Sequence, residues 1–270
     1  MTGWDDPDNA ELYDQFARDH ELYRETSRDL VELARLDDAA LVVDLACGTG
    51  VTTQAILDRV QESANVVALD GSEAMLVIAR RRVTGERVRW VCAPAIDLAQ
   101  HATEADRIVC NSAIWQLDME RAIAAAATTL RRGGRLVFNI GGQFLMLPLT
   151  PEELRPRSPT LPHLIQAVAV LDHGFVPPHP ALSRRRSLTP EGVADIITRS
   201  GLLLDETRTF EYDSPPEAQL AWLSVPVFAQ NVLPGMPYKQ QLDVLAKAYE
   251  RFDKSSGAKG VWMAFVAHKP

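Results

Sequence analysis

The sequence contains no long apolar run and very little cysteine. Its longest uncharged stretch, residues 136–151, is interrupted by two adjacent glycines and a proline, so we expect no membrane-spanning helix. The three cysteines, Cys47, Cys92 and Cys110, are odd in number and match no zinc-ligand spacing, which predicts reduced thiols and no metal site. The first ten residues carry three aspartates and no cation, unlike a secretory signal. These absences predict a cytoplasmic protein.

Positive charge is also in short supply. Lys and Arg number 28 against 36 Asp and Glu, which gives a formal net charge of −8. A protein that binds nucleic acid over a broad surface presents a basic face, so we expect no nucleic-acid partner. The balance of 46% apolar and 24% charged residues indicates a globular chain that is long enough to bury a core without disulfides or metal.

Short apolar runs alternate with amphipathic segments between residues 40 and 140. The expected strands cover residues 40–46, 65–70, 87–92, 107–111 and 135–140, with two further candidates at 202–212 and 260–269. Strands that alternate with helices predict βαβ units and parallel pairing, and near-continuous apolar strands indicate helices on both faces. The pattern predicts an α/β protein with a Rossmann-like, seven-stranded, mostly parallel sheet.

The segments outside these strands are expected to be helical or irregular. Residues 11–36 repeat apolar residues at helical spacing and predict one long helix in an N-terminal helical cap, residues 1–40. Residues 142–188 hold eight of the 17 prolines and predict a Pro-rich lid or substrate insertion with one helix at 161–171. The core is then expected over 41–141 and 189–270, with a helical excursion at 214–255.

The most informative motif is the run Val42–Gly50, which reads Val-Val-Asp-Leu-Ala-Cys-Gly-Thr-Gly. Gly48 and Gly50 let the backbone approach a ligand where a strand turns into a helix. Asp70 ends the next strand, where a carboxylate can accept hydrogen bonds from both ribose hydroxyls of an adenosine. A dinucleotide would require G-x-G-x-x-G for its pyrophosphate, and Asp44 in the loop would repel that group. The pattern therefore favours an adenosine cofactor that has an ammonium group and no phosphate.

S-adenosylmethionine is such a cofactor, and at this point the chain resembles the class I S-adenosylmethionine-dependent methyltransferases of the small-molecule type. The resemblance covers residues 41–140 well, and residues 189–212 and the final strand more weakly. It rests on three features taken together: the loop Asp44–Gly50, the acid Asp70, and the entry to the fifth strand, Leu130-Arg-Arg-Gly-Gly-Arg-Leu-Val137. It implies an antiparallel last strand and S-adenosylmethionine as the cofactor.

The resemblance also implies roles for individual side chains. Asp44 would lie near the methionine end of the cofactor, Asp70 would hold the ribose, and the backbone carbonyl of Asn111 would accept from the cofactor ammonium. Pro94 stands where the family usually has an adenine-binding aspartate, so backbone groups would recognise the adenine. The other expected cofactor residues are Tyr13, Ala46, Gly48, Gly71, Met75, Ala95, Ile96 and Gln116, and the expected acceptor pocket includes Trp115 and Phe144.

Three histidines of the Pro-rich segment, His163, His173 and His179, are the candidate general bases. Histidine titrates near neutral pH and could take a proton from a hydroxyl or an amine. Methyl transfer from a sulfonium is an in-line displacement with a neutral leaving group, so alignment can supply about 7–11 kcal/mol. Such an enzyme needs neither a catalytic triad nor a metal.

The sequence thus predicts a methyltransferase that acts on a small, largely apolar metabolite, as a monomer or a homodimer. The acceptor pocket is expected over the carboxyl ends of the strands. The residues after the fourth strand read Asn111-Ser-Ala-Ile, unlike the Asn/Asp-Pro-Pro-Tyr of enzymes that methylate nucleic-acid bases. Three alternatives stay open: a methyltransferase of tRNA or protein, a cofactor-binding enzyme with a non-methylating reaction, and a non-catalytic binding protein.

Overall fold

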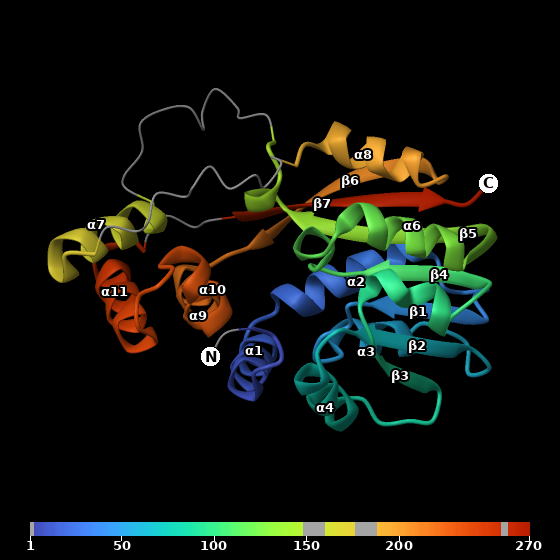
Figure 1. Ribbon diagram of the computed structural model, residues 1–270, viewed down its shortest axis with the longest axis horizontal. Helices are drawn as coiled ribbons and strands as arrows, with labels where there is room; N and C mark the ends of the chain where they lie inside the picture. Colours follow the sequence, from blue (N-terminus) through green and yellow to red (C-terminus); the bar gives the residue numbers. More distant parts are fainter. Residues whose placement is uncertain (1–2, 148–159, 176–187, 255–258) are drawn as a thin grey trace.

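The computed structural model describes residues 3–147, 160–175, 188–254 and 259–270, and it contains a seven-stranded sheet. The strands are β1 (Leu41–Leu45), β2 (Asn65–Asp70), β3 (Val88–Cys92), β4 (Ala105–Cys110), β5 (Leu130–Gly141), β6 (Leu203–Asp213) and β7 (Lys259–His268). They lie in the order β3-β2-β1-β4-β5-β7-β6 (Figure 1). The first five pair in parallel, whereas β7 is antiparallel to both β5 and β6. The predicted Rossmann-like sheet with an antiparallel last strand is confirmed.

Helices cover both faces of the sheet (Figure 1). One layer contains α2 (Leu22–Ala34), α3 (Val51–Leu57) and α4 (Glu73–Arg82), and the other contains α5 (Leu98–His101), α6 (Met119–Thr129) and α8 (Pro190–Arg199). In β1, Val42 packs with the first layer and its neighbour Val43 packs with the second. Both valines are fully buried, as expected for a parallel strand between two helical layers.

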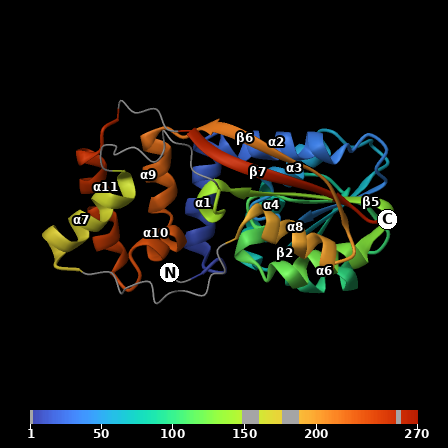
Figure 2. The same cartoon turned by 90° about the horizontal axis from the view of Figure 1, so that it is seen from above.

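Four helices form a helical lobe beside one end of the sheet (Figure 1 and Figure 2). They are α7 (Leu161–His173), α9 (Pro216–Ser224), α10 (Pro226–Val232) and α11 (Tyr238–Arg251). Apolar side chains of α7, α10 and α11 share one buried cluster. A proline lies in the first turn of α7, α9 and α10, where its missing N–H costs nothing. None of the described helices combines the length and the apolar character that crossing a bilayer requires.

The N-terminal region forms two helices, so the single helix expected over residues 11–36 is wrong. The first helix, α1 (Pro7–Asp19), is followed by His20, whose backbone is extended and ends the helix. Arg24 of α2 donates hydrogen bonds to two backbone carbonyls in the last turn of α1, which satisfies groups that a helix end leaves free. The break lets α1 pack against α4, while α2 packs on α3 and the sheet.

Asp106 joins the start of β1 to β4 through its side chain. Its carboxylate accepts hydrogen bonds from the N–H groups of Ala40 and Leu41, each at 2.8 Å, and from Arg131 Nε at 2.5 Å. Burial raises the pKa of this carboxyl, but the hydrogen bonds from Arg131, Leu41 and Ala40 outweigh burial, and its pKa lies below the ordinary value.

We expect D106N to lower the free energy of unfolding by about 1–3 kcal/mol at pH 7, because it removes a charged hydrogen-bond acceptor. A carboxyl whose pKa is lowered by folding stabilises the protein above its unfolded pKa, and this stabilisation is lost as the pH falls through the folded value. The difference between D106N and the wild type should therefore shrink below about pH 4. Urea denaturation at pH 7 and below about pH 4 measures the difference in the free energy of unfolding. D58N, at an exposed aspartate, is the control. Equal stability of D106N and the wild type at neutral pH would contradict this account.

Candidate functional site

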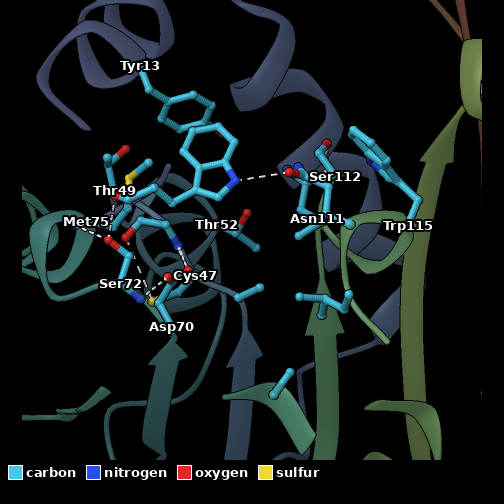
Figure 3. A pocket seen from close by; sticks show the side chains of 18 of the residues that line it. Tyr13, Cys47, Thr49, Thr52, Asp70, Ser72, Met75, Asn111, Ser112 and Trp115 are labelled. Atoms are coloured by element: carbon cyan, nitrogen blue, oxygen red, sulfur yellow. Dashed lines mark hydrogen bonds between the residues drawn. The ribbon is translucent and has the colours of Figure 1, made fainter. Parts of the chain in front are cut away.

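A cavity of about 570 Å³ lies at the carboxyl ends of β1, β2 and β4, within the range of about 300–1,000 Å³ that is typical of small-molecule sites. The strand order reverses between β1 and β4, and open α/β sheets bind ligands at such a switch point. Figure 3 shows Asp70 beyond the end of β2, Asn111 and Ser112 beyond the end of β4, and Tyr13 on the side of the cavity away from the strands.

The loop after β1 lines the cavity with backbone that has positive φ angles. Ala46, Gly48 and Gly50 have φ values of 58°, 52° and 85°, in the left-handed region that favours glycine. A Cβ on Gly50 would lie 3.2 Å from a side chain at the end of α4, so close helix packing requires glycine there. A Cβ on Gly48 would reach only Tyr13, at 4.0 Å. The loop therefore offers its backbone to a ligand that lies below Tyr13.

Asp70 connects this loop to the neighbouring strand. Its Oδ2 accepts a hydrogen bond from the N–H of Gly48 at 2.8 Å, and its Oδ1 accepts one from the N–H of Ser72 at 2.9 Å. Burial raises the pKa of Asp70, and these backbone hydrogen bonds partly oppose the rise. Each carboxylate oxygen has two lone pairs, so each can accept one further hydrogen bond. The arrangement fits the two neighbouring hydroxyls of a ribose.

Asp44 lies behind the lining of the cavity and has one unpaired oxygen. Thr53 Oγ1 donates to its Oδ2 at 2.6 Å, whereas Oδ1 is buried and has no hydrogen-bond partner among the described residues. Burial raises the pKa of Asp44 to about 7, while Thr53 lowers it and Asp70 raises it. A buried acceptor without a partner costs about 1–3 kcal/mol. Asp44, which the sequence assigned to the cofactor, is therefore a buried acceptor behind the cavity wall and is not among the residues that line the cavity.

Comparisons with known proteins agree with this geometry. A family model described as a methyltransferase domain matches residues 42–134. The trans-aconitate 2-methyltransferase of Azoarcus sp. strain BH72 is 34% identical over 143 residues, which are 52% of this chain and 51% of that protein. The malonyl-[acyl-carrier protein] O-methyltransferase of Acetivibrio thermocellus is 29% identical over 138 residues, which are 50% of this chain and 47% of that protein.

The chain contains, at residues 42–134, a match to a methyltransferase domain, and its wider resemblance to the curated relatives covers about half of its length. It spans about half the length of the curated relatives that it matches. The crystal structure of a Bacillus halodurans protein, provisionally described as a methyltransferase, shares the fold. The superposition covers 91% of this chain and 99% of the Bacillus halodurans protein, with a TM-score of 0.56 at 17% identity. The cofactor of the family is S-adenosylmethionine.

Trp4 spans the mouth of the cavity. Its indole Nε1–H donates to Gln116 Oε1 at 3.1 Å, beyond β4, and its backbone oxygen accepts from Ser72 Oγ at 2.8 Å, after β2. The indole meets the ring of Tyr13 edge-on, with centroids 5.5 Å apart. The sequence analysis missed Trp4 because its partners are 68 and 112 residues away and no motif marks it.

Two stacked aromatic pairs line the cavity beside the cofactor loop. Trp115 stacks on Phe144 with ring centroids 3.5 Å apart, and Trp222 stacks on Phe228 at 3.8 Å. The charged side chains in the described lining are all acidic, namely Asp5, Asp70 and Asp118. The cavity thus combines apolar walls with negative charge.

The cavity brings together most of the residues that the sequence assigned to it. The expected residues in its lining are Tyr13, Ala46, Gly48, Asp70, Gly71, Met75, Ala95, Ile96, Asn111, Trp115, Gln116 and Phe144. Lining residues that the sequence did not single out include Trp4, Tyr23, Thr49, Thr52 and Ser112. Tyr23 belongs to α2, so both N-terminal helices contribute to the cavity.

The described histidines of the Pro-rich segment lie away from the cavity. His163 lies 2.8 Å from the Thr160 hydroxyl, and His173 pairs with Asp243 of α11 at 2.9 Å. Helix α7 carries both histidines and packs into the helical lobe instead of over the strand ends. The structure therefore does not bring His163 or His173 to the transfer site, and His179 lies outside the described residues.

Asp44 should make the stability of the protein depend on pH. Its raised pKa means that the folded protein holds a proton between about pH 4 and pH 7 that the unfolded chain releases, so its contribution to stability falls as the pH rises through this window. We expect D44N, which is neutral throughout, to gain stability relative to the wild type between pH 5 and pH 8, by about 1–4 kcal/mol. Urea denaturation at the two pH values measures the free energy of unfolding of each protein. The same pH dependence of this free energy in D44N and in the wild type would contradict the prediction.

The Trp4–Gln116 hydrogen bond should slow the exchange of ligand. In Q116A the indole N–H loses its partner, so we expect the association and dissociation rate constants of S-adenosylhomocysteine to rise together, while Kd changes by less than about threefold. Stopped-flow tryptophan fluorescence measures both rates, and Q100A, on the exposed Gln100, is the control. A rise in the dissociation rate alone would show that Gln116 stabilises the bound ligand and does not close the cavity.

Proposed function

We propose that this protein transfers the methyl group of S-adenosylmethionine to a small, largely apolar acceptor that is neutral or cationic. One observation carries the proposal: Asp70, Asn111 and two stacked aromatic pairs line the same cavity. The first two residues stand at the ends of β2 and β4, where the family binds its cofactor, and the aromatic pairs leave an apolar wall for a second molecule.

The residues of the chain act by binding and aligning. When bound, S-adenosylmethionine supplies a methyl group on a positively charged sulfur, which needs no further activation. Asp70 would accept hydrogen bonds from the ribose hydroxyls, and the backbone carbonyl of Asn111 would accept one from the ammonium group. Trp4 and Tyr13 cover the cavity and exclude water. Alignment of this kind contributes about 7–11 kcal/mol to a displacement in good cases.

The charges of the cavity favour a neutral or cationic acceptor. Its described lining carries three carboxylates, of which Asp70 is half-buried and Asp5 and Asp118 are exposed, and like charges brought close together repel each other. Trans-aconitate, after which one relative is named, is a tricarboxylate and would meet this repulsion. Aromatic faces instead attract planar apolar groups and cations. The acceptor that we propose therefore differs in charge from that of the relative.

Calorimetric titration of the full chain tests the cofactor part of this proposal. We expect one molecule of S-adenosylmethionine to bind per chain, and we expect D70N to weaken binding at least about tenfold because the ribose loses a charged acceptor. D58N, at an exposed aspartate, serves as the control. No heat of binding by the wild type at millimolar cofactor would refute the proposal.

Mass spectrometry of reaction mixtures tests the acceptor part. Neutral aromatic and amine-bearing compounds are offered beside trans-aconitate, with isotope-labelled S-adenosylmethionine as the donor. We expect label in the first two groups and none in trans-aconitate. Label that appears only in added tRNA or protein would replace the small-molecule proposal by a macromolecular one.

A further inference from the structure

Asn139 of β5 contacts both residues of the turn that follows β4. It is 2% exposed, and the sequence did not single it out. Its Oδ1 accepts a hydrogen bond from the N–H of Ser112 at 2.7 Å, and its Nδ2 donates to Asn111 Oδ1 at 2.9 Å. The sheet register pairs Cys110 with Phe138, which places Asn139 beside the first residue after β4. One side-chain amide therefore holds the turn at two consecutive residues.

Ser112 needs such support because its backbone is in the left-handed region, with φ of 58°. A residue with a side chain adopts this conformation at a cost and keeps it only where its surroundings impose it. The hydrogen bond from its N–H to Asn139 is a direct restraint on this conformation. Because the peptide between Asn111 and Ser112 carries the Asn111 carbonyl, the same restraint sets where that carbonyl points.

The hydrogen-bond network continues from the turn into the first helical layer. Asn111 Nδ2 donates to Thr26 Oγ1 at 3.1 Å and to Ser27 Oγ at 3.0 Å, and Ser27 Oγ lies 2.9 Å from Thr52 Oγ1. Asn111 and Thr52 line the cavity, whereas Thr26 and Ser27 stand behind it. Buried networks of paired polar groups are rigid. The turn is therefore held from β5 on one side and from α2 and α3 on the other.

We propose that Asn139 is a positioning residue for the cofactor: it orients the Asn111–Ser112 turn so that the Asn111 carbonyl faces the methionine end of the cavity. Asn139 does not line the cavity and acts through the two turn residues. This inference rests on the proposed function, since it gives the turn a cofactor to meet.

Calorimetric binding of S-adenosylhomocysteine to the full chain tests the inference. N139L keeps the number and branching of the side-chain heavy atoms, with larger methyl groups in place of the amide, and removes both hydrogen bonds, so we expect Kd to rise about tenfold. N139L/S112G should bind more tightly than N139L, because glycine adopts a positive φ without a restraint. The control is V137A, which removes buried volume from the same strand away from the turn. It should lower the Tm and leave Kd within about twofold.

The outcomes separate this inference from the proposed function. If the wild type fails to bind S-adenosylhomocysteine, the proposed function falls and this inference falls with it. If the wild type binds and N139L binds equally well, the inference alone is overturned. If N139L does not fold, N139A gives the same comparison, because it also removes both hydrogen bonds and adds no bulk, and an unchanged Kd in N139A overturns the inference.

Discussion

The hydrogen bond from the N–H of Gly48 to the carboxylate of Asp70 is the interaction on which the site depends. It joins the loop after β1 to the end of β2, two neighbouring strands in parallel register. The loop reaches Asp70 with Ala46, Gly48 and Gly50 at positive φ. Asp44, at the end of β1 just before this loop, is buried and pairs with Thr53 of α3. The two acids on either side of the loop therefore differ, one lining the cavity and one buried behind it.

The cavity is closed by parts of the chain that are distant from this loop in sequence. The break between α1 and α2 lets one helix pack on α4 and the other on the sheet, and each contributes a tyrosine to the cavity. Trp4 then bridges the two sides of the mouth. Helix α7 of the Pro-rich segment goes to the helical lobe, whereas Phe144 of the same segment lines the cavity. The cover of the cavity comes mainly from the N-terminal region and from α9 and α10.

The electrostatics of the cavity and its rigid surroundings act together. Burial raises the pKa of Asp44 and of Asp70, which means that a cationic ligand would relieve a cost already present in the folded protein. Behind the cavity, the network around Asn139 holds uncharged donors and acceptors in fixed positions. In the function that we propose, the carboxylates favour the charge of the ligand, and the network orients the backbone groups that meet it.

The sequence by itself determined the order of strands and helices, the loop before Gly50 and the acid Asp70. Strand periodicity and glycine conformation depend on neighbouring residues, so a local pattern carries them. The place of Trp4, the break after α1, the removal of His163 and His173 to the lobe, and the contact of Asn139 with Asn111 were decided only by the tertiary structure. The contacts of Trp4 with Gln116 and of Asn139 with Asn111 join residues 112 and 28 positions apart, and no local pattern encodes such contacts.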